Sequence, residues 1–270
     1  MSVEQVAALP SKRREDGAVR AILREIAVGG LAGLVVGILL GGIGGRLVMR
    51  FAALVVPESV GAATENGTIV GDITVAGTLA LIVFVGLFAG ALAGSIWVTI
   101  EPWLPVAYGL RALVSIPIAI AVGTRALVED HNPDFAILGH DPLVVASLVL
   151  LIAAFGPAMV LADAVLDRRL PRAGERPGTG AVYAVIAALG VALTAVMVVP
   201  AFLGTPLWLV GVALIVVGIA TLVSWALRIR GQPIPSPIVI VGRGALIAAT
   251  LFGFVVVVPE ITGALGMPWR

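Results

Sequence analysis

Long runs of hydrophobic residues, separated by short polar stretches, make up most of this chain. A helix that crosses the hydrocarbon core of a bilayer needs about 20 mostly apolar residues. The stretches that meet this requirement cover residues 26–45, 74–100, 106–128, 143–166, 181–203, 207–227 and 238–258. The pattern therefore predicts an all-α membrane protein, built as a bundle of seven transmembrane helices.

The polar stretches predict where helices begin and how the chain is divided. Three predicted starts place a side-chain acceptor before a proline, which is typical of an N-cap followed by the first helical position. These pairs are Asp141-Pro142, Thr205-Pro206 and Ser236-Pro237. Residues 1–20 are predicted to form a mobile basic tail in the cytoplasm, and residues 21–270 a single transmembrane domain.

The placement of positive charge predicts the orientation of the chain. The loops at 57–73, 129–142 and 204–206 contain no lysine or arginine, whereas the N-terminal tail and the connections that follow the fourth and sixth predicted helices are basic. The positive-inside rule then puts the N-terminus in the cytoplasm and, after seven spans, the C-terminus outside. We expect a multi-pass protein of the plasma (inner) membrane of a bacterium.

Composition agrees with this class and excludes others. The 270 residues are 60% hydrophobic and only 12% charged, against about 25% charged in soluble domains. A net charge of +1 gives no field that would attract nucleic acid. The chain has no cysteine, which excludes disulfides, thiolate metal sites and cysteine nucleophiles. The expected partners are the lipid bilayer and a second copy or another membrane protein, with no cofactor.

Glycines recur at every fourth position of the first predicted helix. They are Gly29, Gly33, Gly37, Gly41 and Gly45, and the second helix repeats the spacing at Gly86, Gly90 and Gly94. In lipid, close backbone contact through small residues drives helix association. We expect these two glycine faces to pack together; the alternative is homo-oligomerisation through the first helix.

Three arginines lie near the predicted outer ends of the first and third helices: Arg46, Arg50 and Arg125. They are expected either to bind lipid phosphates or the carboxylates of the outer loops, or to form an outer vestibule for a small anion. On a regular α-helix the first two arginines lie about 160° from the centre of the glycine ridge. They are therefore predicted to point away from the glycine contact.

A histidine- and carboxylate-rich loop is the one candidate metal site. His131, Asp134, His140 and Asp141 offer the ligand types that zinc and other divalent metals take. Their spacing matches no defined motif, and Asn132-Pro133 is a turn signal in its own right. We favour a turn-rich connector over a metal site.

Two further features fall inside the predicted spans. Asp163 and Arg243 lie near the inner ends of the fourth and seventh helices, where we expect them to pair; the alternative is a proton-relay carboxylate. Pro117 and Pro157 lie at similar depths in the third and fourth helices. They are expected to bend their helices, or alternatively to line a cavity.

Specific activities are mostly excluded. The only lysine, Lys12, lies in the tail, so a retinal Schiff base inside a helix is excluded. The glycine run lacks the Gly-Lys-Ser/Thr of a phosphate loop. We expect a non-enzymatic polytopic membrane protein, structural or accessory to a membrane assembly. A transporter or channel for a small anion is the alternative, and a cation sensor using the acidic loop a third reading.

Overall fold

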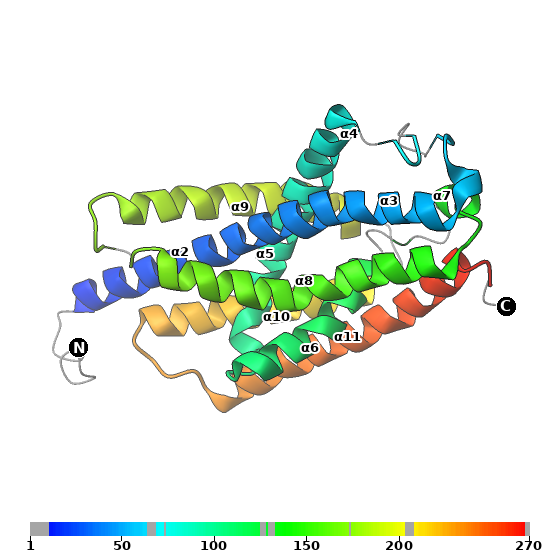
Figure 1. Cartoon of the computed structure of the whole chain (residues 1–270). Helices are drawn as coiled ribbons and strands as arrows, with labels where there is room; N and C mark the ends of the chain where they lie inside the picture. Colours follow the sequence, from blue (N-terminus) through cyan, green and yellow to red (C-terminus); the bar gives the residue numbers. More distant parts are fainter. Residues whose placement is uncertain are drawn as a thin grey trace.

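The computed structural model describes residues 11–63, 69–72, 74–124, 128, 133–172, 174–202 and 208–267, and helices form nearly all of this part (Figure 1). The helices are α2 (Ser11–Val36), α3 (Gly45–Val55), α4 (Val75–Ala80), α5 (Phe88–Ile100), α6 (Tyr108–Gly123), α7 (Pro133–Ile137), α8 (Pro142–Arg169), α9 (Thr179–Phe202), α10 (Trp208–Ile229) and α11 (Ser236–Ala264). Two π-helices, η1 (Gly37–Gly44) and η3 (Leu81–Leu87), and two 3-10 turns, η2 (Pro57–Ser59) and η4 (Glu101–Trp103), complete the set.

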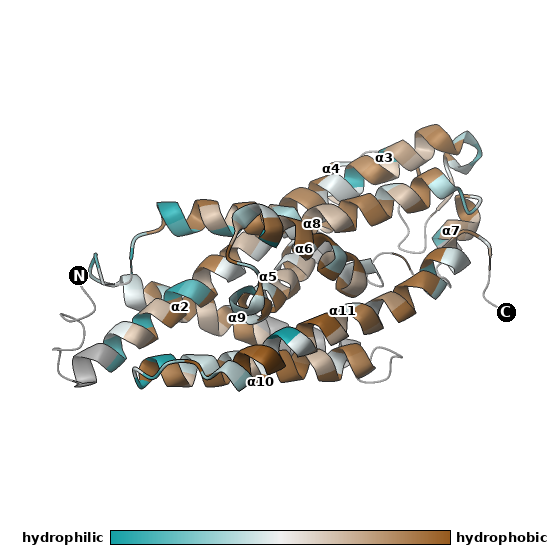
Figure 2. Cartoon of the chain, turned by 90° about the horizontal axis from the view of Figure 1, so that it is seen from below, coloured by the Kyte–Doolittle hydropathy of each residue, from teal (hydrophilic) through white to brown (hydrophobic). Residues whose placement is uncertain are grey.

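The helical architecture and its apolar character agree with the sequence prediction. The helices long and apolar enough to cross a membrane are Glu15–Val55, Val75–Trp103, Pro142–Arg169, Leu209–Ile229 and Ser236–Ala264, with shorter apolar helices at Tyr108–Gly123 and Thr179–Ala192. Figure 2 shows hydrophobic residues along most of each helix and hydrophilic residues mainly towards the helix ends. The architecture is thus all-helical with five potential spans, and the count of seven stays a prediction.

The first helix differs from its prediction at both ends. α2, η1 and α3 follow one another without a break, and the part Glu15–Val55 alone has 41 residues. At 1.5 Å per residue this is about 60 Å, twice the thickness of the hydrocarbon core. The helix already begins at Ser11, inside the segment 1–20 that was predicted to be a mobile tail. Arg46 and Arg50 also lie well before the end of the helix rather than at it.

The bundle has two distinct ends (Figure 1). One end holds the start of α2 and the C-terminal turns of α8 and α10. We call it the basic end, because Arg168, Arg169 and Arg228 lie in those last turns. The opposite end holds the C-terminus of α3, α7, the start of α8 and the C-terminus of α11. Asp141 caps α8 there, since its Oδ1 accepts from the amides of Leu143 and Val144, which confirms the predicted helix start.

The packing order of the helices positions the candidate sites. α5 packs on α2, α8 packs on both α2 and α6, and α11 packs on α6 and α10. The two π-helices, η1 in the first span and η3 in the second, pack against each other. The main hydrophobic core gathers residues of most of these helices, including Ala32, Trp97, Met159, Val217 and Leu246.

Candidate functional site

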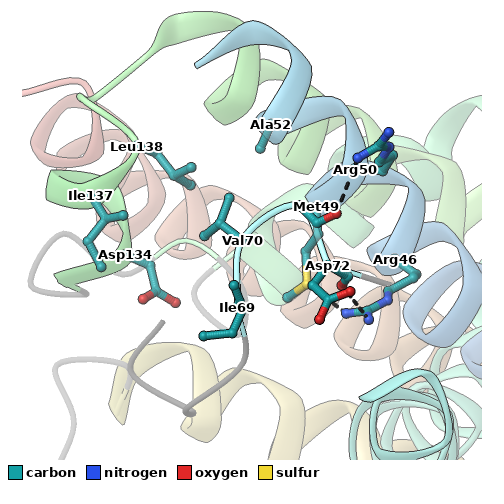
Figure 3. A pocket seen from close by; sticks show the side chains of 11 residues that line it. Arg46, Met49, Arg50, Ala52, Ile69, Val70, Asp72, Asp134, Ile137 and Leu138 are labelled. Carbon is teal, nitrogen blue, oxygen red and sulfur yellow. Dashed lines mark hydrogen bonds between the residues drawn. The ribbon is translucent and has the colours of Figure 1, made fainter. Parts of the chain in front are cut away.

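A small cavity at the opposite end brings both described candidate arginines together (Figure 3). We call it the arginine pocket; its volume is about 70 Å³. Its walls are α3, the segment 69–72 and α7 with the residue that follows it. The lining residues are Arg46, Met49, Arg50, Ala52, Ile69, Val70, Gly71, Asp72, Asp134, Ile137 and Leu138.

A tight loop closes the pocket over α3. The amide of Gly61 donates to the carbonyl of Val70 (3.1 Å), and the amide of Val70 donates to the carbonyl of Ala62 (2.9 Å). Gly71 then adopts a φ of +84°, a conformation that glycine reaches without the steric cost of a side chain. This turn directs the carbonyls of Gly71 and Asp72 towards the two arginines.

The two arginines bind main-chain carbonyls. Nη2 of Arg46 donates to the carbonyl of Asp72 (2.9 Å), and Nη1 of Arg50 donates to that of Gly71 (3.2 Å). Arg46 is only 9% exposed and its Nε has no hydrogen-bond partner. Nη1 of Arg46 has only the weak acceptor Met49 Sδ, at 4.0 Å. A buried guanidinium with incomplete hydrogen bonding is costly, so this group favours an additional acceptor.

Carboxylates line the same pocket as the two arginines. Asp72 and Asp134 both contribute to the lining. Within the described part of the chain, neither Arg46 nor Arg50 forms an ion pair with a carboxylate. Among the described residues, the partners of both arginines are main-chain oxygens, and the choice between lipid phosphates and loop carboxylates stays a prediction. Arg125, the third candidate, lies outside the described residues.

Arg46 does not point away from the second span, which corrects the prediction. A Cβ added at Gly77 of α4 would lie 3.2 Å from Nη2 of Arg46, so the guanidinium lies against the start of that span. The reason is the π-helix between Gly37 and Gly44, whose hydrogen bonds run from i to i+5. If this wider turn absorbs one residue, the position of Arg46 around the helix axis changes by about 100° relative to a regular α-helix. Arg46 then lies about 80° from Gly37 around the axis.

The glycine faces of the first two spans lie in close backbone contact. A Cβ added at Gly33 would lie 2.3 Å from the carbonyl oxygen of Gly90 and 2.4 Å from Cα of Gly94; one at Gly37 would lie 2.2 Å from the carbonyl oxygen of Gly86. A Cβ at Gly29 would lie 2.5 Å from Cγ2 of Val98, whereas one at Gly45 would meet open space. Gly41 lines a cavity described below. The contribution of these glycines to stability stays a prediction.

The described candidate metal ligands each have a different contact or location in the structure. Nδ1 of His140 lies 2.9 Å from the carbonyl oxygen of Ala264, Asp141 caps α8, and Asp134 lies in the arginine pocket. His131 lies outside the described residues. Over the described ranges no group of three or more histidine, cysteine or carboxylate side chains is placed to hold a metal.

Asp163 and Arg243 do not pair, which corrects that prediction. No ion pair joins them within the described part of the chain. Asp163 on α8 lies instead near Arg111, which attracts its carboxylate, and near Glu101, which repels it, whereas Arg243 on α11 is exposed. The physical reason is the packing order, because α8 and α11 both pack on α6.

Charged residues at the basic end form ion pairs that the sequence did not predict. Arg111 Nη1 donates to Glu101 Oε1 (2.6 Å), and Arg228 binds both carboxylate oxygens of Glu25 (2.7 and 2.8 Å). Arg24 binds Asp167 and the carbonyls of residues 167, 170 and 171 at the end of α8. The signal available in the sequence was only that Glu25 and Glu101 lie at the ends of predicted spans.

A second cavity, which we call the core cavity, is lined by sequence neighbours of the two prolines but not by the prolines themselves. It has a volume of about 320 Å³ and lies between α5, α6 and α8. Ile118 and Gly156, the neighbours of Pro117 and Pro157, are part of its lining. Trp97 and Ser115 are the polar side chains among its described lining residues, and Ser115 Oγ already donates to the carbonyl of Ala112 (2.8 Å). The core cavity is therefore largely apolar.

These features define an all-helical protein with several helices long and apolar enough to cross a membrane. No known protein family, curated protein or solved structure matches the chain. The functional argument therefore depends on the geometry of the two cavities and on the surface of the helices.

Proposed function

We propose that the chain is a non-enzymatic, multi-pass membrane protein that serves as a structural or accessory component of a membrane assembly. The observation that carries this proposal is the core cavity, because none of its described lining residues is ionisable. Intramembrane solute paths and proton relays depend on polar and ionisable groups. An apolar interior supports a protein that acts through packing and surface contacts rather than through chemistry at its centre.

The proposed topology has seven crossings, with the N-terminus in the cytoplasm of a bacterium and the C-terminus outside its plasma membrane. The two shorter apolar helices, within α6 and α9, supply the crossings beyond the five long ones. The arginines in the last turns of α8 and α10 support a cytoplasmic basic end. A reporter fused after Arg270 should therefore be located outside the cytoplasm. A reporter signal from the cytoplasm would contradict this topology.

Native mass spectrometry of the full chain, extracted together with its own lipids, tests the accessory role. We expect a mass above that of one copy, from a second copy or from another membrane protein. A monomer that conducts anions in liposomes would contradict the proposal.

A second candidate function, transport or conduction of a small anion, is favoured by one observation. Arg46 is buried with an unpartnered Nε, and Arg50 lies in the same pocket without an ion pair to any described carboxylate. An anion would supply the missing acceptor. Against a full pathway, the arginine pocket and the core cavity share no lining residue.

Anion flux into liposomes separates the two candidates. If the protein is a transporter, liposomes that contain it should take up chloride or phosphate faster than empty liposomes do. Arg46→Gln should abolish this additional uptake. Arg176→Gln is the matched control, because Arg176 is exposed in the connection between α8 and α9. Uptake equal to that of empty liposomes leaves the accessory role as the supported function.

A further inference from the structure

A groove of about 460 Å³ runs between α6 and α11, away from both the arginine pocket and the glycine contact. We call it the α6–α11 groove. η4 and the two residues after it close the groove towards the basic end. Its lining consists of Trp103, Leu104, Pro105, Val114, Pro117, Ile118, Arg243, Leu246, Ile247, Thr250 and Leu251.

The rim of the groove lies on the outer surface of the bundle. Two of its lining residues on α11, Ile247 and Leu251, are 61% and 62% exposed. In a chain whose helices are long and apolar enough to cross a membrane, large apolar side chains with this exposure face lipid tails. The groove therefore opens to the hydrocarbon region of the bilayer.

One wall of the groove is rigid. The indole Nε1 of Trp103 donates to Oγ1 of Thr221 (2.8 Å), and Thr221 in turn donates to the carbonyl of Thr99 (2.7 Å). A Cβ added at Gly242 would lie 2.5 Å from the Trp103 ring, so the indole lies directly on the backbone of α11. These contacts hold the closed end of the groove in place without any ligand.

Arg243 is the one charged residue of this lining. It is exposed and, within the described part of the chain, has neither a hydrogen bond nor an ion pair. The carboxylate of Glu101 in η4 is bound to Arg111, and Oγ1 of Thr250 already donates to the carbonyl of Leu246 (2.9 Å). The free guanidinium is therefore the polar group that the groove offers to a ligand.

The depth of Arg243 matches the edge of the hydrocarbon layer. α11 has 29 residues and is about 43 Å long, so it exceeds the roughly 30 Å core by about 6 Å at each end if centred. Arg243 lies seven residues after Ser236, or about 10 Å along the axis. Its Cα is then about 4 Å inside the core, within reach of the phosphate level for a long side chain.

We propose that the α6–α11 groove binds an anionic phospholipid from the leaflet at the basic end. The guanidinium of Arg243 donates to the phosphate, and one acyl chain runs along the groove from Trp103 towards Leu251. The distance from Arg243 to Leu251 is about 12 Å along α11, close to the roughly 15 Å of one leaflet's hydrocarbon layer. A cation at the end of an apolar groove of this length matches a lipid in both charge and shape.

Lipid retention in native mass spectrometry tests the proposal. The full chain is reconstituted into vesicles of equal parts phosphatidylglycerol and phosphatidylcholine, extracted and analysed for bound lipid. We expect preferential retention of phosphatidylglycerol, reduced about tenfold or more in Arg243→Gln, which removes the charge-assisted hydrogen bond. Arg230→Gln, an exposed arginine just beyond α10, is the charge-matched control and should retain lipid like the unmodified chain.

A second variant separates the groove from simple electrostatic attraction. Val114→Phe leaves Arg243 in place but fills part of the groove, and it should lower retention of the same lipid. Equal retention of both lipids by the unmodified chain, or equal retention by Arg243→Gln and Arg230→Gln, would overturn the proposal. Retention unaffected by Val114→Phe in a folded protein would overturn the acyl-chain part of it.

Discussion

Replacing Gly33 by alanine places a methyl group inside the contact between α2 and α5. The added Cβ would lie 2.3 Å from the carbonyl oxygen of Gly90 and 2.4 Å from both N and Cα of Gly94. All three are backbone atoms, which no rotamer change can move away. Restoring an ordinary contact of at least 3.4 Å requires the two helices to separate by about 1 Å at this point.

The expected cost follows from that separation. Overpacking of a close-packed interior costs about 1–3 kcal/mol, and a 1 Å gap also weakens the dispersion contacts along the rest of the interface. We therefore expect Gly33→Ala to lower the free energy of unfolding by about 1–3 kcal/mol. Unfolding in detergent micelles, followed by circular dichroism at increasing denaturant, measures this directly.

Gly30→Ala is the matched control on the same helix. A Cβ added at Gly30 meets nothing within 4 Å, so the change should stay within about 0.5 kcal/mol of the unmodified protein. Equal stability of the two variants would show that the close approach seen at Gly33 and Gly90 contributes no packing energy. The reasoning about the glycine faces would then be refuted.

Three other substitutions give separate tests of local contacts by the same unfolding measurement. Thr221→Val should cost about 1–3 kcal/mol, because it leaves the buried indole N–H of Trp103 without an acceptor. Gly156→Ala should cost about 1–3 kcal/mol, since its Cβ would lie 2.4 Å from the carbonyl oxygen of Ser115. Asp141→Ala should cost about 1 kcal/mol through loss of the α8 N-cap.

Partly exposed positions supply the controls for two of these substitutions. Thr262→Val removes a hydroxyl that bonds only to its own helix and is exposed, and Gly190→Ala meets nothing within 4 Å. Both should be near neutral. If Thr221→Val and Thr262→Val cost the same, the Trp103 bond has no net value; equal costs at Gly156 and Gly190 would remove the argument for close packing of α6 and α8.

The positions of the apolar helices could be predicted because hydropathy and length report the solvent directly. α8, for example, covers Pro142–Arg169, against a predicted 143–166. The Asp141 cap could be predicted for a similarly local reason, since the acceptor and the proline are adjacent in the chain. Charge placement identified the two ends of the bundle but not which charges meet there.

Contacts between non-neighbouring helices could not be predicted. Asp163 and Arg243 were expected to pair because both lie near the same end of the chain's spans. Whether α8 meets α11 depends on the order of helices around the bundle, and hydropathy carries no information on that order. The charges of Arg111 and Glu101 act on Asp163, and these two residues lie on α6 and η4. Only the fold reveals that these elements come near Asp163.

The hydrogen-bond register of the first helix is the other property that the sequence pattern did not reveal. Gly37 and Gly42 are five residues apart and would point about 140° apart on an α-helix. In the structure both face the second span, since Cβ atoms added there would lie 2.2 Å from the carbonyl oxygen of Gly86 and 2.9 Å from Cγ1 of Ile82. The i→i+5 bonding of η1 places residues five apart on one face.

A single deletion tests this register. If η1 holds one residue more than an α-helix needs, deleting Ile43, which is 44% exposed, converts the segment to α-helix while the flanking faces stay in place. Arg46 should keep its bond to the carbonyl of Asp72, and the variant should fold. Leu150 is 69% exposed and lies in the regular helix α8. Because α8 has no π-helix there with an extra residue to lose, deleting Leu150 shifts the helix register.

The two deletions differ in a measurable way. Loss of Leu150 rotates one half of α8 by about 100° against the other, although both halves are packed through buried residues such as Val145 and Met159. We therefore expect the Leu150 deletion to unfold or aggregate on size-exclusion chromatography, and the Ile43 deletion to elute as the unmodified protein does. If both deletions caused the same unfolding or aggregation, η1 would be required as a π-helix. The hypothesis that η1 holds one extra residue, which can be deleted without moving the faces of α2 and α3, would then be refuted.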